Sequence, residues 1–183
     1  MNRGELAVVT GASRGLGREL ALALAREGYD LLICARGAAD LEAVRAEVVA
    51  LGRKCQVWQG DLMTATPALA EALEISPVEV LINNAALAPA LKPLEELTTE
   101  DFYPALLLNL CVPSRLMQAA VRSMKPRESG VIVNICSLSG RRAIRNASLY
   151  SASKFALRGM TEAVAQELEG TGVRCFSVSP AGM

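Results

Sequence analysis

The chain has 183 residues, of which 51% are hydrophobic and 21% charged, a composition typical of one globular domain. Its 19 Lys and Arg residues balance 19 Asp and Glu residues, so no strong net charge indicates nucleic acid or a membrane surface as a partner. The sequence has no histidine, which excludes serine–histidine triads and imidazole metal ligands.

The five cysteines are an odd number without a CxxC pair, which favours free thiols in a reducing cytoplasm over a metal site or disulfides. The first apolar run is too short for a signal peptide, and no apolar run approaches the roughly 20 residues that span a bilayer. We therefore expect a soluble cytoplasmic protein without a metal, organised as a single domain over residues 1–183.

Six short apolar runs predict β-strands. Most are apolar almost throughout rather than alternating, as in parallel sheets covered on both faces. In chain order they are residues 6–11, 30–36, 55–61, 78–85, 130–137 and 173–180.

Helical patterns separate these runs at residues 17–28, 38–52, 66–74, 98–124 and 148–170. The fourth opens on "TTED", a capping-box pattern, but Pro104 and Pro113 predict that it is kinked or begins later. The segment between Asp61 and Val78 predicts only a short helix. The alternation predicts an α/β fold, a doubly wound, Rossmann-like parallel sheet with helices on both faces.

A glycine-rich turn, "TGASRGLG", joins the first strand to the first helix. Glycines permit a tight turn and close backbone approach, and the N–H groups that begin the helix can bind a pyrophosphate. This context predicts a dinucleotide site more strongly than the glycines alone. The turn residues assigned to the cofactor are Gly11, Ser13, Arg14, Gly15, Leu16 and Gly17.

Arg36 ends the second strand, about where NAD-binding folds place an acidic residue for the ribose 2′-hydroxyl. With Arg14 in the turn, it makes two cations and no carboxylate at this end of the site. This pattern favours NADP(H), because a carboxylate would repel the additional phosphate.

The glycine turn, "NNAA" after the fourth strand, a serine after the fifth and "YSASK" together resemble the short-chain dehydrogenase/reductase family, over nearly the whole chain. The resemblance implies that Asp61 and Leu62 contact adenine, and that Asn84 lies beside the cofactor ribose. Ala85, next to Asn84, is also assigned to the cofactor. The family usually has glycine where this chain has Ala86. Pro180, after the last strand, is also assigned to the cofactor.

The resemblance further implies a catalytic group of Ser137, Tyr150, Lys154 and Asn109. Ser137 lies thirteen residues before Tyr150, the family spacing, which favours it over Ser139. Asn109 would hold a water of the proton relay, and Tyr150 and Lys154 would also contact the cofactor.

The chemistry of Tyr150 and Lys154 can be argued from the residues themselves. On a helix the two side chains stand one turn apart on the same face. A neighbouring ammonium favours the phenolate, so the tyrosine could give a proton to a developing alkoxide or take one from an alcohol. Ser137 would polarise the carbonyl oxygen. These residues predict NADPH-dependent reduction of a ketone or aldehyde, or the reverse oxidation.

Two other functions remain open: an NADP-binding regulatory or scaffold protein, and an epimerase or dehydratase of the extended type, which the glycine spacing disfavours. The sequence ends at "VSPAGM", where the family continues into a substrate lobe and a last strand. We expect a fold without that lobe and strand, whether the tail is mobile, natively absent or cut away; of these we favour a mobile tail. Helical segments 98–124 and 148–170 resemble a dimer contact of the family, so we expect a homodimer or homotetramer.

Overall fold

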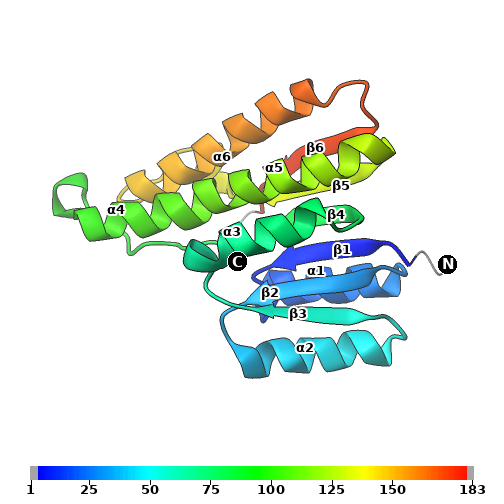
Figure 1. Ribbon diagram of the computed structural model, residues 1–183. Coiled ribbons are helices and arrows are strands. Elements are labelled where there is room, and N and C mark those ends of the chain that lie inside the picture. Colours follow the sequence, from blue (N-terminus) through cyan, green and yellow to red (C-terminus); the bar gives the residue numbers. More distant parts are fainter. Residues whose placement is uncertain (1–3, 181–183) are drawn as a thin grey trace.

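The protein, described here from a computed structural model over residues 4–180, is built on one parallel sheet of six strands (Figure 1). The strand order is β3-β2-β1-β4-β5-β6, and every pair is parallel. The strands are β1 (Leu6–Thr10), β2 (Asp30–Ala35), β3 (Cys55–Gln59), β4 (Val78–Asn83), β5 (Gly130–Ile135) and β6 (Val173–Val178).

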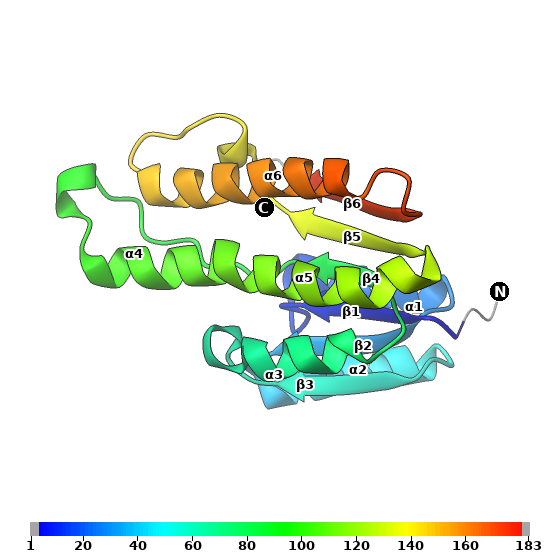
Figure 2. The same cartoon turned by 45° about the horizontal axis from the view of Figure 1, so that its top comes forward.

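Helices cover both faces of the sheet, as a doubly wound fold requires (Figure 2). The α-helices are α1 (Gly15–Arg26), α2 (Ala38–Ala50), α3 (Leu62–Glu74), α4 (Thr99–Leu106), α5 (Val112–Met124) and α6 (Ser148–Glu167). One core cluster joins α1 and α2 to strand residues such as Val9 and Ile33; the other joins α3 and α5 to Val8 and Ile132. The predicted fold class is confirmed.

The strand order places a topological switch point at the carboxyl end of the sheet. The chain leaves β1 for β2 on one side, and returns to pair β4 with the other side of β1. The loops after β1 and β4 therefore diverge and open a crevice, which is where open α/β sheets bind ligands. The glycine turn and "NNAA" are those two loops.

The third helix is longer than expected. It begins at Leu62 rather than at residue 66 and has 13 residues, so the prediction of a short helix was wrong. The carboxylate of Asp61 accepts a hydrogen bond from the backbone N–H of Met63 (3.0 Å) and so caps the helix. Pro67 lies inside the helix, where its ring removes one backbone donor without ending the element.

The fourth helical segment begins where the capping pattern indicates and not later. The carboxylate of Asp101 accepts a hydrogen bond from the backbone N–H of Thr98 (3.0 Å) ahead of α4. Between α4 and α5 the chain widens into η2, a π-helical turn over Leu107–Cys111, in which the N–H of Val112 bonds the carbonyl of Leu107. Pro113 has no N–H for the carbonyl of Asn109, so the irregular turn lies where proline disfavours α-helix.

This continuous helix, Thr99–Arg127, is long and apolar enough by composition to cross a membrane, the one such helix among residues 4–180. The sequence contains no uninterrupted apolar run of this length, because polar residues are interspersed along the helix. Met117 and Leu116 of α5 are buried in the core against α3 and the sheet. Core packing therefore accounts for its hydropathy.

Candidate active site

The glycine turn is closed tightly against the end of β4. Gly11 has φ +67°, and a Cβ there would lie 2.9 Å from Nδ2 of Asn84. A Cβ on Gly17 would lie 2.2 Å from the carbonyl oxygen of Gly11. Because no side chain fits at either position, these two glycines set the path of the turn.

The third glycine of the turn faces open space. Gly15 has φ +55°, and a Cβ built on it meets no atom within 4 Å. It is the first residue of α1, whose N-cap, Arg14, makes no side-chain capping bond, and the first turn holds no acidic residue. The uncapped N–H groups and the positive end of the helix dipole therefore fit a pyrophosphate.

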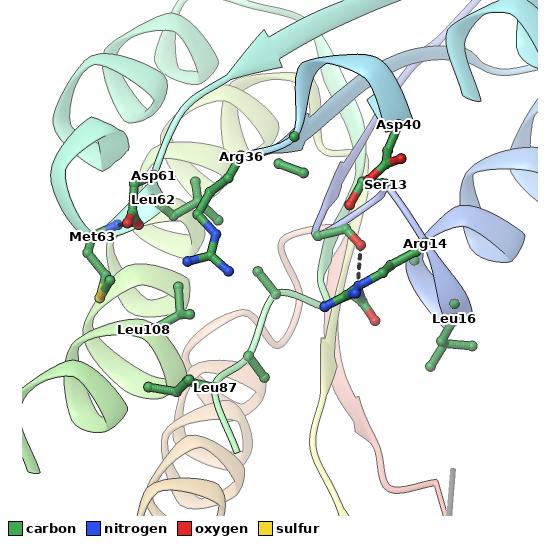
Figure 3. A pocket seen from close by; sticks show the side chains of 18 of the residues that line it. Ser13, Arg14, Leu16, Arg36, Asp40, Asp61, Leu62, Met63, Leu87 and Leu108 are labelled. Carbon is green, nitrogen blue, oxygen red and sulfur yellow. Dashed lines mark hydrogen bonds between the residues drawn. The ribbon is translucent and has the colours of Figure 1, made fainter. Parts of the chain in front are cut away.

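A cleft of about 710 Å³ opens over this turn and contains most of the predicted cofactor residues (Figure 3). This volume lies within the usual range for small-molecule and cofactor sites. The predicted residues that line it are Gly11, Ser13, Arg14, Gly15, Leu16, Gly17, Arg36, Asp61, Leu62, Asn84, Ala85 and Tyr150. The other residues that line it, which the sequence analysis did not assign to the cofactor, are Ala35, Gly37, Asp40, Gly60, Met63, Ala86, Leu87, Ala88 and Leu108.

Two arginines reach toward this cleft. Figure 3 shows the side chains of Arg14 and Arg36 directed into it from two elements, the glycine turn and the end of β2. Both are exposed, and neither forms an ion pair with a described carboxylate. Their guanidinium groups are therefore available to a phosphate.

One carboxylate lies at the same end of the cleft. Asp40, in the first turn of α2, lines the cleft, as Ser13 of the glycine turn does (Figure 3). The expectation of two arginines without a carboxylate at this end of the site is therefore corrected. Arg36 holds the motif position, but Asp40, four residues later, also lines the cleft. A Cβ on Gly37 would lie 3.3 Å from the Asp40 carboxylate, so this carboxylate comes close to the end of β2.

Asn84 braces the two loops of the crevice. Its side-chain N–H groups donate to the carbonyls of Thr10 (3.0 Å) and Gly11 (3.2 Å). The hydroxyl of Thr10 accepts from the backbone N–H groups of Asn84 and Ala85, both at 3.0 Å. Asn84 thus fixes the glycine turn relative to β4.

Tyr150 and Lys154 meet on α6 as their spacing predicts. The Nζ atom of Lys154 lies 5.9 Å from the centroid of the Tyr150 ring and donates to the carbonyl of Ile135 (2.9 Å). Lys154 is only 2% exposed, and burial lowers the pKa of its ammonium, an effect that Cys136 partly offsets. Tyr150 lines the cleft, whereas Lys154 lies behind it.

Ser137 lies two residues after the end of β5 and is the N-cap of η4 (Leu138–Gly140). Its hydroxyl oxygen accepts a hydrogen bond from the backbone N–H of Ser139 (3.2 Å), while its own proton has no described acceptor. Ser139, the alternative, is buried. The carbonyl of Pro180 accepts from the N–H of Leu138 (3.3 Å), so Pro180 lies beside η4 and outside the lining of the cleft.

Asn109 lies in the π-helical turn η2 and is 1% exposed. Its side-chain oxygen accepts from the N–H of Leu87 (2.8 Å), and its two N–H groups donate to the carbonyl of Leu87 (2.8 Å) and the hydroxyl of Ser153 (3.0 Å). Ser153 donates in turn to the carbonyl of Tyr150 (2.8 Å). Asn109 therefore connects the loop after β4 to the helix of Tyr150.

Comparison with known proteins agrees with this geometry. The chain is 32% identical over 182 residues to a 3beta-hydroxysteroid dehydrogenase of Mediterraneibacter gnavus, covering 97% of this chain and 66% of that protein. It is 35% identical over 178 residues to the L-xylulose reductase of Mesocricetus auratus, covering 97% of this chain and 71% of that protein. The chain therefore spans about two thirds of the length of these relatives.

Solved structures share the fold closely. A metagenomic short-chain oxidoreductase in complex with NADP has a TM-score of 0.91 at 34% identity, over 98% of this chain and 83% of that one. An NAD⁺-bound xylitol dehydrogenase has a TM-score of 0.90 at 27% identity, over 98% and 71%. The model of the short chain dehydrogenase family matches residues 5–183. The chain therefore belongs to the short-chain dehydrogenase/reductase family.

Proposed function

We propose that this protein is an NADP(H)-dependent oxidoreductase that reduces a ketone or aldehyde, or oxidises the corresponding alcohol. The observation that carries the proposal is the buried ammonium of Lys154 behind Tyr150, whose ring lines the same cleft as the glycine turn. The family and its named relatives, a steroid dehydrogenase and a sugar reductase, support the same reaction class.

The residues of the cleft fit the dinucleotide. Gly11, Gly15 and Gly17 would admit the pyrophosphate to the N-terminus of α1, where the uncapped N–H groups lie. Asp61 and Leu62 would contact the adenine, and Asn84 and Ala85 the ribose. When bound, the nicotinamide supplies or accepts the hydride.

The proton would be handled by Tyr150, as acid in reduction and as base in oxidation. The Lys154 ammonium would favour the phenolate and hydrogen-bond the ribose, and the Ser137 hydroxyl would donate to the carbonyl oxygen. All the side-chain N–H groups of Asn109 are engaged. A relay water would therefore bond the second lone pair of its side-chain oxygen or its main chain, and the side chain would mainly hold the relay in place.

The preference for NADP(H) over NAD(H) rests on Arg14 and Arg36, which have no described carboxylate partner. The NADP complex among the similar structures supports it, and the NAD⁺-bound structure shows that the fold accepts either cofactor. Asp40 at the same end of the cleft would moderate the preference rather than reverse it, because two cations outweigh one anion.

The second candidate is an NADP-binding regulatory or scaffold protein with little turnover. The test is oxidation of NADPH in the presence of a panel of ketones and aldehydes. Turnover of at least one carbonyl supports the enzyme. NADPH binding without turnover across the panel favours the binding protein.

We also propose a homo-oligomer, located in the cytoplasm. Ala152, Ala156, Gly159 and Ala163 lie on one face of α6 at helical spacing, and all are exposed. A Cβ on Gly159 would meet nothing within 4 Å. Such a small, flat face lets a second helix approach closely.

A further inference from the structure

The loop between η4 and α6 is strongly cationic. It holds Arg141, Arg142 and Arg145 within five residues and no acidic residue. All three are exposed, and none makes an ion pair or a side-chain hydrogen bond with another described residue. Elsewhere arginines such as Arg45 and Arg127 pair with carboxylates.

The loop is hydrogen-bonded at both ends to residues next to Ser137 and Tyr150 in the sequence. It starts four residues after Ser137, where the N–H of Arg142 bonds the carbonyl of Leu138 (3.0 Å). Its last arginine, Arg145, lies five residues before Tyr150, and the N–H of Ile144 donates to the hydroxyl of Ser151 (3.4 Å). Because an extended residue spans at most about 3.6 Å, each arginine Cα atom lies within about 14–18 Å of the Cα atom of either Ser137 or Tyr150. Figure 2 shows the loop (yellow) arching beside the start of α6.

The opposite segment, after β4, does not neutralise this charge. The N–H of Lys92 donates to the carbonyl of Asn146 (2.8 Å), which brings the two segments together. Lys92 pairs with Asp101 (2.9 Å), and the exposed Glu95 and Glu96 form no ion pair with the loop. The three arginine charges therefore face solvent beside the site.

The two segments also expose apolar side chains. Leu138 precedes the arginines and Ile144 lies between Arg142 and Arg145; the two side chains are 47% and 46% exposed. Leu87 and Leu91, from the segment after β4, are 37% and 68% exposed. An apolar rim next to cations complements a molecule with a hydrocarbon part and an anionic end.

A single exposed arginine is ordinarily a solvated surface residue. Here three arginines without acidic partners lie in the loop that joins Ser137 to Tyr150, on a chain with no net charge. Together they produce a local positive potential that would attract anions to this site. Guanidinium groups bind carboxylate and phosphate oxygens in pairs, which a neutral substrate cannot exploit.

We propose that the substrate is an amphiphilic carbonyl compound whose distal end carries an oxyanion, a carboxylate or a phosphate, held by Arg141, Arg142 and Arg145. The inference rests on the proposed function, since it assigns the carbonyl end of this molecule to Ser137 and Tyr150.

Three probes test it: a long-chain methyl ketone ending in a carboxylate, the same ketone ending in a phosphate ester, and the matching primary amide. Their affinity is measured calorimetrically on protein saturated with NADP⁺, and their turnover with NADPH. The variant is the triple Arg141→Gln, Arg142→Gln, Arg145→Gln. The control is Arg26→Gln, an exposed arginine without an ion pair at the far end of α1.

We expect at least one anionic probe to bind about ten- to thirtyfold more tightly than the amide, given three exposed charge contacts. The preference should fall with added salt and disappear in the triple variant, but persist in the control. Equal affinity of the wild type for all three probes, or a preference kept by the triple variant, overturns the inference. A preference that appears only when the ketone is attached to an acidic protein also overturns it.

Binding and turnover separate this inference from the proposed function. Anion-selective binding without turnover supports the arginine site and contradicts the oxidoreductase. Turnover of all three probes without selectivity supports the oxidoreductase and contradicts the arginine site.

Discussion

At the scale of single residues, the site holds an ammonium group that is almost completely buried, since Lys154 is only 2% exposed. The ammonium of Lys154 has one described hydrogen-bond acceptor, the carbonyl of Ile135, and burial lowers its pKa. A lysine whose pKa is lower in the folded than in the unfolded state binds its proton less strongly when folded. Its contribution to stability is therefore unfavourable at neutral pH and is relieved as the pH rises toward its ordinary value of 10.5. The fold tolerates this cost at a position that suits proton transfer.

Replacing that lysine should separate stability from activity. We expect Lys154→Met to abolish turnover while the thermal midpoint at pH 7 stays the same or rises, because the buried charge is removed. Differential scanning calorimetry with a parallel NADPH oxidation assay measures both. A midpoint several degrees lower would show that the lysine stabilises the fold.

Cofactor choice is also a residue-scale property. Arg36→Ala should raise the Kd of NADPH about ten- to hundredfold, the loss of a charged hydrogen bond to phosphate, and leave the Kd of NADH nearly unchanged. Fluorescence titration with both cofactors provides the measurement, with Arg26→Ala as the matched control. A tighter wild-type affinity for NADH would contradict the role given to Arg14 and Arg36.

At the scale of elements, the cleft is made by loops that leave the carboxyl ends of parallel strands. The predicted strands extend one or two residues past the observed ends, because the motif residues belong to the loops that follow. Parallel strands bring such ends together, and this is why the sequence could predict that Gly11, Arg36 and Asn84 would share one cleft.

Other features could not be predicted, because they depend on the path of the chain in space. Asp40 belongs to no motif. It reaches the cleft because only two residues separate the end of β2 from the start of α2. The bonds of Asn109 to Leu87 and Ser153 span 22 and 44 residues. The start of α3 depends on one capping bond from Asp61, ahead of the helical pattern that the sequence showed from residue 66.

The start of α4 offers a pH test at this scale. The side chain of Lys92 and the N–H of Thr98 lower the pKa of the Asp101 carboxyl below its ordinary 3.8. Its stabilising effect is thus present above that pH and is lost as the pH falls through the lower, folded value. Asp101→Asn should lower the urea midpoint at pH 6, and the difference from wild type should shrink near pH 3. A difference that grows toward low pH would contradict the sign of this shift.

At the scale of the whole molecule, the exposed small-residue face of α6 predicts self-association. We expect light scattering to give at least twice the 19.4 kDa mass of the chain. Gly159→Glu, at a position where a side chain meets no atom of its own chain, should shift the mass toward the monomer without lowering the thermal midpoint. A monomeric wild-type protein would contradict the oligomer.

In the whole molecule, the cofactor cleft, Tyr150 and the cationic loop all lie toward the carboxyl end of the sheet. The central claim is that Tyr150, with Lys154 behind it, transfers a proton beside bound NADP(H). The most direct measurement compares Tyr150→Phe with the wild type for kcat/KM on an accepted carbonyl and for the Kd of NADPH. The account predicts a loss of about 10²–10⁴-fold in kcat/KM, the usual worth of a general acid, with the Kd nearly unchanged. Turnover within a few-fold of wild type would contradict it.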